Sequence, residues 1–243
     1  MRLNNPNTVV AIHRAILGAQ SGCDKKAQAR EIAGKIEKTK AQQFAEYIEE
    51  CFISICEDLH VFEMARDWAK KSEFEKLTVA DNIIKRFVAH LKSDVRTGRA
   101  KKYNNMSAES MSDEAVPNIF VARAQDGLMS VSLKGWVNIN PNWSFYSDLT
   151  RFLMDLRHEA THIVDIFFPE LSPLDFDILV RAQLFYVDGH DDFGLYESNP
   201  LELNANTRRR EFGDIVRAKI ALCEYNRIRG MAGNGMGSII RGR

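Results

Sequence analysis

The sequence predicts an α+β fold in which a mostly helical first part precedes a small sheet and further helices. Apolar side chains recur three and four positions apart through most of residues 1–98, which is the helical period. After residue 117, short apolar segments alternate with polar residues or are separated by turn-forming residues, as strands are. Of the 243 residues, 45% are hydrophobic and 27% are charged, a globular composition that can bury a sizeable core.

Residues 1–98 form the predicted helical region, and the polar, aperiodic residues 99–116 form a linker or mobile loop. Within the helical region, an apolar stripe predicts one long helix from about 24 to 59. Thr78 followed by Asp81 resembles a capping box, in which a hydroxyl and a carboxylate three residues apart bond each other's backbone N–H groups. This pair predicts that a further helix begins at Thr78.

Strands are predicted in the segment that follows the linker. Residues 118–124 and 128–133 are strand-like, and Asp126 with Gly127 between them predicts a hairpin turn. Residues 136–140 alternate apolar and polar side chains. We expect this last strand to lie at a sheet edge, with one packed face and one wet face.

Two long helices are predicted after the strands. The first covers 147–167, with an apolar stripe on one face and polar side chains opposite. The second begins at Pro200, because proline suits the first turn of a helix, and reaches about Arg229. Residues 230–243 form a tail rich in glycine and arginine that we expect to lack regular structure.

A metal-binding motif lies in the first of these helices, where residues 158–162 read His-Glu-Ala-Thr-His. Side chains four positions apart lie one helical turn above each other, so His158 and His162 can reach a single ion. Zinc accepts two or three nitrogen ligands and leaves a position open for water. Glu159 lies next to these ligands and can accept a proton from that water.

A catalytic zinc ion needs a third protein ligand, and Glu202 is the strongest candidate. Pro200 begins a helix there and places Glu202 in its first turn. Asn206 follows one turn later and could hydrogen-bond a ligand histidine and orient it. Other carboxylates remain open as alternatives for the third ligand: Glu197, Asp188 and Asp191.

The motif followed by a helical glutamate resembles the gluzincin branch of the zincin metallopeptidases. The resemblance covers about 117–228 and implies a compact zincin-like core at 117–229, with a small sheet, an active-site helix and a glutamate-bearing C-terminal helix. It implies that Glu202 is the third zinc ligand. Asn206 stands where the family commonly has an aspartate that orients a histidine. The strand at 136–140 is similar in position to the family's edge strand, which binds extended substrate.

Hydrolysis by a zincin also needs a donor to the oxyanion that forms when water attacks a carbonyl. Tyr196 and His190 lie in the stretch between the two helices, where such a donor is expected. The pattern does not choose between them.

These residues predict a zinc-dependent metallopeptidase that hydrolyses peptide bonds of a peptide or protein substrate. A small zincin with an added helical part is similar in form to toxin or effector metallopeptidases. The apolar run near the N-terminus is interrupted by His13 and Arg14, so we read no signal peptide. We therefore expect a cytoplasmic protein, or one delivered by a specialised secretion system that needs no signal peptide.

Two alternative functions belong to other classes. The first is a nucleic-acid-associated metalloprotease, suggested by the basic run from Arg208 to Arg210 and by the arginine-rich C-terminal tail. The net charge is zero and few aromatic residues accompany this run, so nucleic acid is not the expected partner. The second is a non-catalytic binding or interaction module.

The four cysteines form no CxxC pair and predict neither a disulfide framework nor a zinc knuckle.

Overall fold

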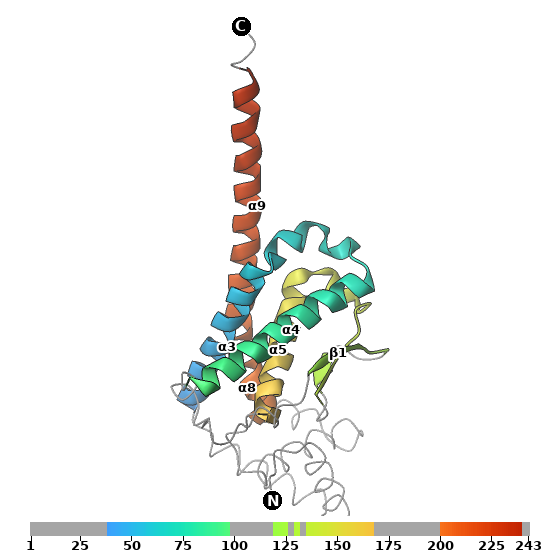
Figure 1. Ribbon diagram of the computed structural model, residues 1–243, viewed down its shortest axis with the longest axis vertical. Coiled ribbons are helices and arrows are strands. Elements are labelled where there is room, and N and C mark those ends of the chain that lie inside the picture. The colour runs from blue at the N-terminus through green and yellow to red at the C-terminus, as the bar shows by residue number, and fades with distance from the viewer. Residues whose placement is uncertain (1–37, 98–118, 126–128, 132–134, 168–199, 240–243) are drawn as a thin grey trace, which may run out of the picture.

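The computed structural model describes residues 38–97, 119–125, 129–131, 135–167 and 200–239 (Figure 1). These residues are mostly helical and include a three-stranded mixed sheet, which confirms the α+β class. The predicted linker at 99–116 and the predicted turn at Asp126 and Gly127 lie outside the described residues. Among the described helices, none has the length and apolar character needed to cross a bilayer.

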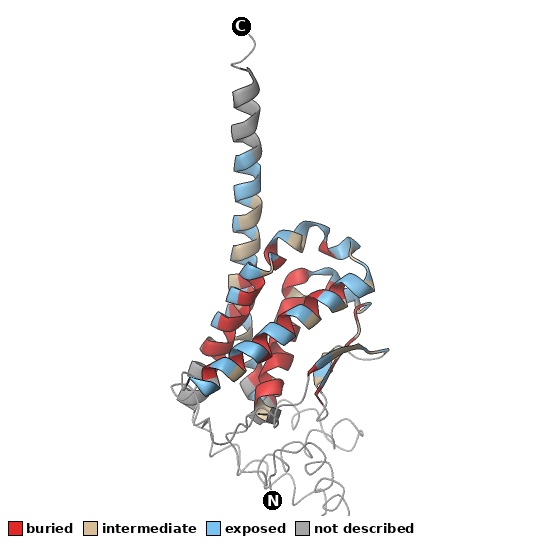
Figure 2. Ribbon diagram, in the orientation of Figure 1, coloured by how far each residue is buried: buried red, intermediate tan, exposed pale blue. Residues whose placement is uncertain are grey.

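The first described elements are α3 (Lys38–Asp58), the 3-10 helix η1 (Val61–Lys70) and α4 (Glu73–Arg96). They pack into the same buried cluster as the later helices (Figure 2). Phe52 on α3 meets Phe87 on α4 at a ring-centroid distance of 5.3 Å and Phe212 on α9 (Arg209–Ile239) at 6.3 Å. One hydrophobic core therefore joins the N-terminal helices to the C-terminal part of the chain.

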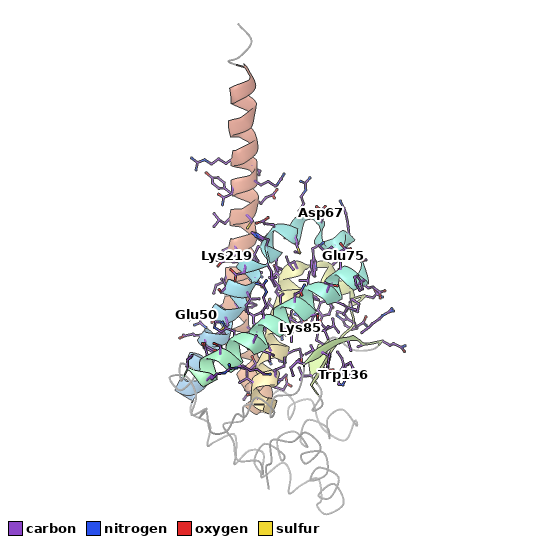
Figure 3. All side chains as sticks on the ribbon, in the orientation of Figure 1. Glu50, Asp67, Glu75, Lys85, Trp136 and Lys219 are labelled. Carbon is purple, nitrogen blue, oxygen red and sulfur yellow. The ribbon has the colours of Figure 1, made fainter. Side chains whose placement is uncertain are left out.

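Helix α4 begins earlier than the sequence predicts. The backbone N–H and the hydroxyl of Ser72 both donate to Glu75 Oε2 at 2.8 Å, and the Glu75 N–H donates back to Ser72 Oγ at 3.3 Å. These bonds lower the pKa of Glu75 to about 2. Thr78 lies inside the helix and donates to the Phe74 carbonyl at 2.8 Å, so the predicted cap at Thr78 and Asp81 is wrong. Figure 3 labels Glu75 at the true start.

The sheet consists of β1 (Phe120–Arg123), β2 (Met129–Val131) and β3 (Trp136–Ile139) in the order β1-β3-β2. Strand β3 pairs in parallel with β1 and antiparallel with β2. The predicted hairpin between β1 and β2 is therefore wrong, and so is the edge position predicted for 136–140. Alternation of apolar and polar residues reports which faces of a strand are buried, whereas its place in a sheet depends on which backbones pair with it.

Helix α5 (Leu149–Phe167) follows the short 3-10 helix η4 (Ser144–Ser147) and is the helix with the metal-binding motif. Asp148 caps it, since its Oδ1 accepts a bond of 2.8 Å from the Thr150 N–H. The predicted apolar stripe is buried as expected, from Leu149 to Ile163. The opposite, polar face is also largely buried (Figure 2), because α3, α8 and α9 contact α5.

The single C-terminal helix predicted from Pro200 is two helices. Pro200 begins α8 (Pro200–Asn206) as predicted, but Arg208 has a left-handed φ of 56° and separates α8 from α9. Helix α9 continues to Ile239, past the predicted end at Arg229, so much of the predicted irregular tail is helical. The far half of α9 extends away from the rest of the molecule (Figure 1).

Candidate metal centre

The two motif histidines and Glu202 meet where α8 lies against α5. The Nε2 atoms of His158 and His162 are 3.1 Å apart. Each of them lies 3.3 Å from one oxygen of Glu202, Oε2 for His158 and Oε1 for His162. The structure therefore brings together the three residues that the sequence predicts as metal ligands.

These three side chains are largely removed from solvent. Glu202 is 1% exposed, and the side chains of His158 and His162 are 11% and 12% exposed. A carboxylate buried this deeply needs positive or hydrogen-bonding partners, which the imidazoles supply. Histidines on a solvated helix face, or a glutamate that only begins a surface helix, would be exposed rather than buried in this way.

The spacing of the donor atoms fits a tetrahedral ion. Ligand atoms held about 2.1 Å from such an ion lie about 3.4 Å from one another. The observed donor-to-donor distances of 3.1, 3.3 and 3.3 Å are close to this value. Two imidazole nitrogens and one carboxylate also form a donor set that suits a divalent transition metal.

The electrostatics of the centre depend on these contacts. Burial raises the pKa of Glu202, but bonds from His158 and His162 outweigh burial and lower it below its usual range. Burial lowers the pKa of His162, but the carboxylates of Asp165 and Glu202 outweigh that effect and raise it to about 10. In the absence of metal, His162 is therefore a cation held between carboxylates. A metal ion that replaces this charge must displace its proton.

Glu159, the predicted general base, is buried beside the two histidines. Burial raises its pKa, whereas His162 and His158 act in the opposite direction. The negative charges of Glu202 and Asp155 also raise it. Glu159 is thus a carboxylate with greater affinity for protons than one in water.

The residue beside the second nitrogen of His162 is one that the sequence pattern does not single out. Asp165 Oδ2 lies 3.6 Å from His162 Nδ1, one turn along the same helix. Asn206, expected to orient a histidine, is exposed and its amide oxygen accepts a bond of 3.0 Å from Arg209. The sequence could have predicted this contact, because residues three positions apart in a helix lie on the same face, as Asp165 and His162 do.

Five residues named as site candidates lie in the segment 168–199, outside the described part of the chain. The candidate oxyanion donors Tyr196 and His190 lie outside the described residues. The same holds for the alternative third ligands, Glu197, Asp188 and Asp191. Of the carboxylates that the sequence offers as third ligand, Glu202 is the one whose position is described.

In the basic run after α8, Arg208 and Arg209 form ion pairs with other helices, whereas Arg210 is exposed. Arg208 donates to Glu49 at 3.1 Å and to Glu46 at 3.2 Å, both on α3. Arg209 pairs with Asp155 on α5. Guanidinium groups held in this way are not available as a patch for phosphates.

Comparison of the chain with protein-family models, curated proteins and solved structures found no match.

Proposed function

We propose that this protein is a zinc-dependent metallopeptidase of the zincin type that hydrolyses peptide bonds. The observation that supports this most directly is the position of Glu202, which meets both histidines of the His-Glu-Ala-Thr-His motif. Two imidazoles and one carboxylate are the ligands of a catalytic zinc site with a free fourth position. A structural zinc site would use four protein ligands.

In this mechanism each residue of the centre has a separate role. His158 and His162 offer neutral Nε2 atoms, and the Glu202 carboxylate offsets part of the ion's charge. Zinc, when bound, polarises a water molecule and brings its pKa towards neutrality. The Glu159 carboxylate would accept a proton from the attacking water and donate it to the leaving amine nitrogen as the C–N bond of the peptide breaks. Its raised pKa makes it a stronger base for this transfer.

Strand β2 is the better candidate for the strand that holds an extended substrate. Strand β3 is paired on both sides, so its backbone has no free edge for a peptide. Strand β2 contacts α5 and lies at an edge of the sheet formed by the described strands. An extended peptide can add to such an edge through main-chain hydrogen bonds.

The test combines zinc content with hydrolysis of unfolded proteins and peptides, followed by mass spectrometry. We expect about one zinc ion per chain for the three-ligand site. Glu159→Gln should keep the zinc and lose hydrolysis, whereas His158→Ala should lose both. Glu50→Gln, an exposed change on α3 (Figure 3), is the control and should alter neither.

The outcomes separate the functions. A chain that binds no zinc would refute the metal centre. Full hydrolysis by Glu159→Gln would refute the role of that residue as base. A zinc-loaded chain that cleaves nothing would favour the alternative of a non-catalytic binding module.

A further inference from the structure

Arg157 is a buried arginine of α5, next to the first ligand histidine, and it contacts two other helices, α3 and α8. Its guanidinium is fully buried, and Nη1 donates to the Ala205 carbonyl on α8 at 2.8 Å. Nη2 donates to the Ala45 carbonyl on α3 at 3.4 Å and lies 3.6 Å from Glu49 Oε1 on the same helix. A charge this deeply buried persists only where its partners are in place.

The contact with Ala205 bears directly on Glu202. The two residues are three positions apart on α8, so they lie on the same face, and both are buried. Helix α8 has seven residues, too few to be stable by its own hydrogen bonds. Its position is therefore determined by tertiary contacts. The carbonyls of its last turn need donors from elsewhere, and Arg157 is the donor to Ala205.

Glu49 on α3 contacts Arg157 and also a second arginine near α8. Its Oε1 faces Arg157, and its Oε2 accepts a bond of 3.1 Å from Arg208 Nε. Arg208 is the left-handed residue between α8 and α9. One buried carboxylate of α3 therefore contacts both the arginine that binds α8 and Arg208 in the turn between α8 and α9.

We propose that Glu49 and Arg157 form a clamp that positions Glu202 in the metal centre, so that helix α3 is part of the metal site. This inference rests on the proposed function. Both are positioning residues, because neither offers an atom to the ion. Loss of the clamp removes the donor to Ala205 and lets α8 shift, which moves the Glu202 carboxylate relative to the two imidazoles.

The test measures zinc dissociation constants and the visible absorption of the Co²⁺-loaded protein, which reports ligand geometry rather than stability. Glu49→Gln should weaken zinc binding by about 10-fold or more, the loss typical for residues that orient metal ligands, and should alter the Co²⁺ spectrum. Arg157→Lys keeps the charge but loses the fork of donors, so we expect a smaller change in the same direction.

The matched control is Glu57→Gln. Glu57 is also on α3, and its ion pair with Lys219 joins α3 to α9 without touching α8 (Figure 3 labels Lys219). This variant loses one link between α3 and α9 but should keep the zinc affinity and the Co²⁺ spectrum of the parent chain.

A double variant covers the case in which a lone buried charge prevents folding. Replacing both Glu49 and Arg157 by Met removes both charges of the ion pair at once, and such apolar replacements often leave folding intact. Arg208 retains Glu46 as a partner. The double variant should fold and still bind zinc about 10-fold more weakly, because Ala205 lacks its donor. Parental affinity with an unchanged Co²⁺ spectrum would overturn the clamp.

Failure of the proposed function has a different signature. A parent chain that binds neither Zn²⁺ nor Co²⁺ would refute the metal centre itself. Hydrogen exchange of the α8 amides in the metal-free proteins then tests the clamp alone. Faster exchange of α8 in Glu49→Gln than in Glu57→Gln supports the clamp, and equal exchange overturns it.

Discussion

At the scale of single residues, Glu202 has an imidazole nitrogen 3.3 Å from each of its carboxylate oxygens. Without metal, this contact is an ion pair with a protonated His162, which burial strengthens. With a divalent ion, the same carboxylate neutralises part of the metal's charge, and both imidazoles must be neutral. The charge of Glu202 is therefore balanced by a protonated histidine in the metal-free protein and by the ion in the metal-bound protein. Proton binding competes with metal binding as a result.

Replacing Glu202 by Ala should weaken zinc affinity by at least the loss of about 10–100-fold that is typical when a residue that only orients a ligand is removed. The change removes one of three donors and leaves the ion with two neutral ligands. Competition with a chromophoric chelator measures the effect. Glu211→Ala is the control, because Glu211 is an exposed glutamate in the first turn of α9. Equal affinity in the parent and Glu202→Ala would move the third ligand elsewhere.

The metal-free protein should lose stability as pH rises. The pKa of His162 is raised to about 10 in the folded protein, against about 6.5 in an unfolded chain. Protonation therefore stabilises the fold fully below about pH 6.5, and this contribution is lost as pH rises through about 10. Urea unfolding of chelator-treated protein across this range measures the decline. A stability that stays level there, or the same decline in His162→Gln, would contradict the assignment.

At the scale of elements, the start of helix α4 depends on which of two similar sequence motifs lies where the chain enters the helix. Both Ser72 with Glu75 and Thr78 with Asp81 have the spacing of a capping box. Lys71, just before Ser72, is extended, so the chain enters the helix there and Thr78 is already inside it. Spacing identifies candidates for a cap, and the direction of the incoming chain selects between them.

Ser72→Ala should therefore lower the free energy of unfolding by about 1 kcal/mol, because it removes the hydroxyl that caps α4. Thr78→Ala, in the same helix, should change it by less than about 0.5 kcal/mol, since the Thr78 hydroxyl only bonds a carbonyl of the preceding turn. Urea denaturation of both variants provides the comparison. A larger loss in Thr78→Ala would restore the later start of the helix.

At the scale of the whole molecule, the N-terminal helices and the metal-binding helix share one core. Phe52 on α3 contacts aromatic rings of α4 and α9. Glu49 and Ala45, on the same helix, contact Arg157 on α5. The sequence boundary at residue 98 marks the end of the helical pattern, and helices on both sides of it contribute side chains to this core.

Phe52→Ala should lower the free energy of unfolding by about 3–5 kcal/mol, because it leaves a cavity among three helices. Phe74→Ala is the matched control, since Phe74 is 77% exposed and its loss should have little effect. Thermal or urea unfolding followed by circular dichroism gives both values. If Phe52→Ala were as mild as the control, the shared core would be refuted.

The sequence by itself determined which side chains share a helical face, because the hydrogen bonds that make a helix are local. The pairing of His158 with His162 follows from their spacing, and the helix start at Pro200 follows from the preference of proline for a first turn. Spacing did not predict the central place of β3 or the break at Arg208. It also missed the contact of Arg157 with Glu49 and Ala205. These depend on backbones and side chains distant in the chain, so only tertiary packing decided them, including the approach of Glu202 to both histidines.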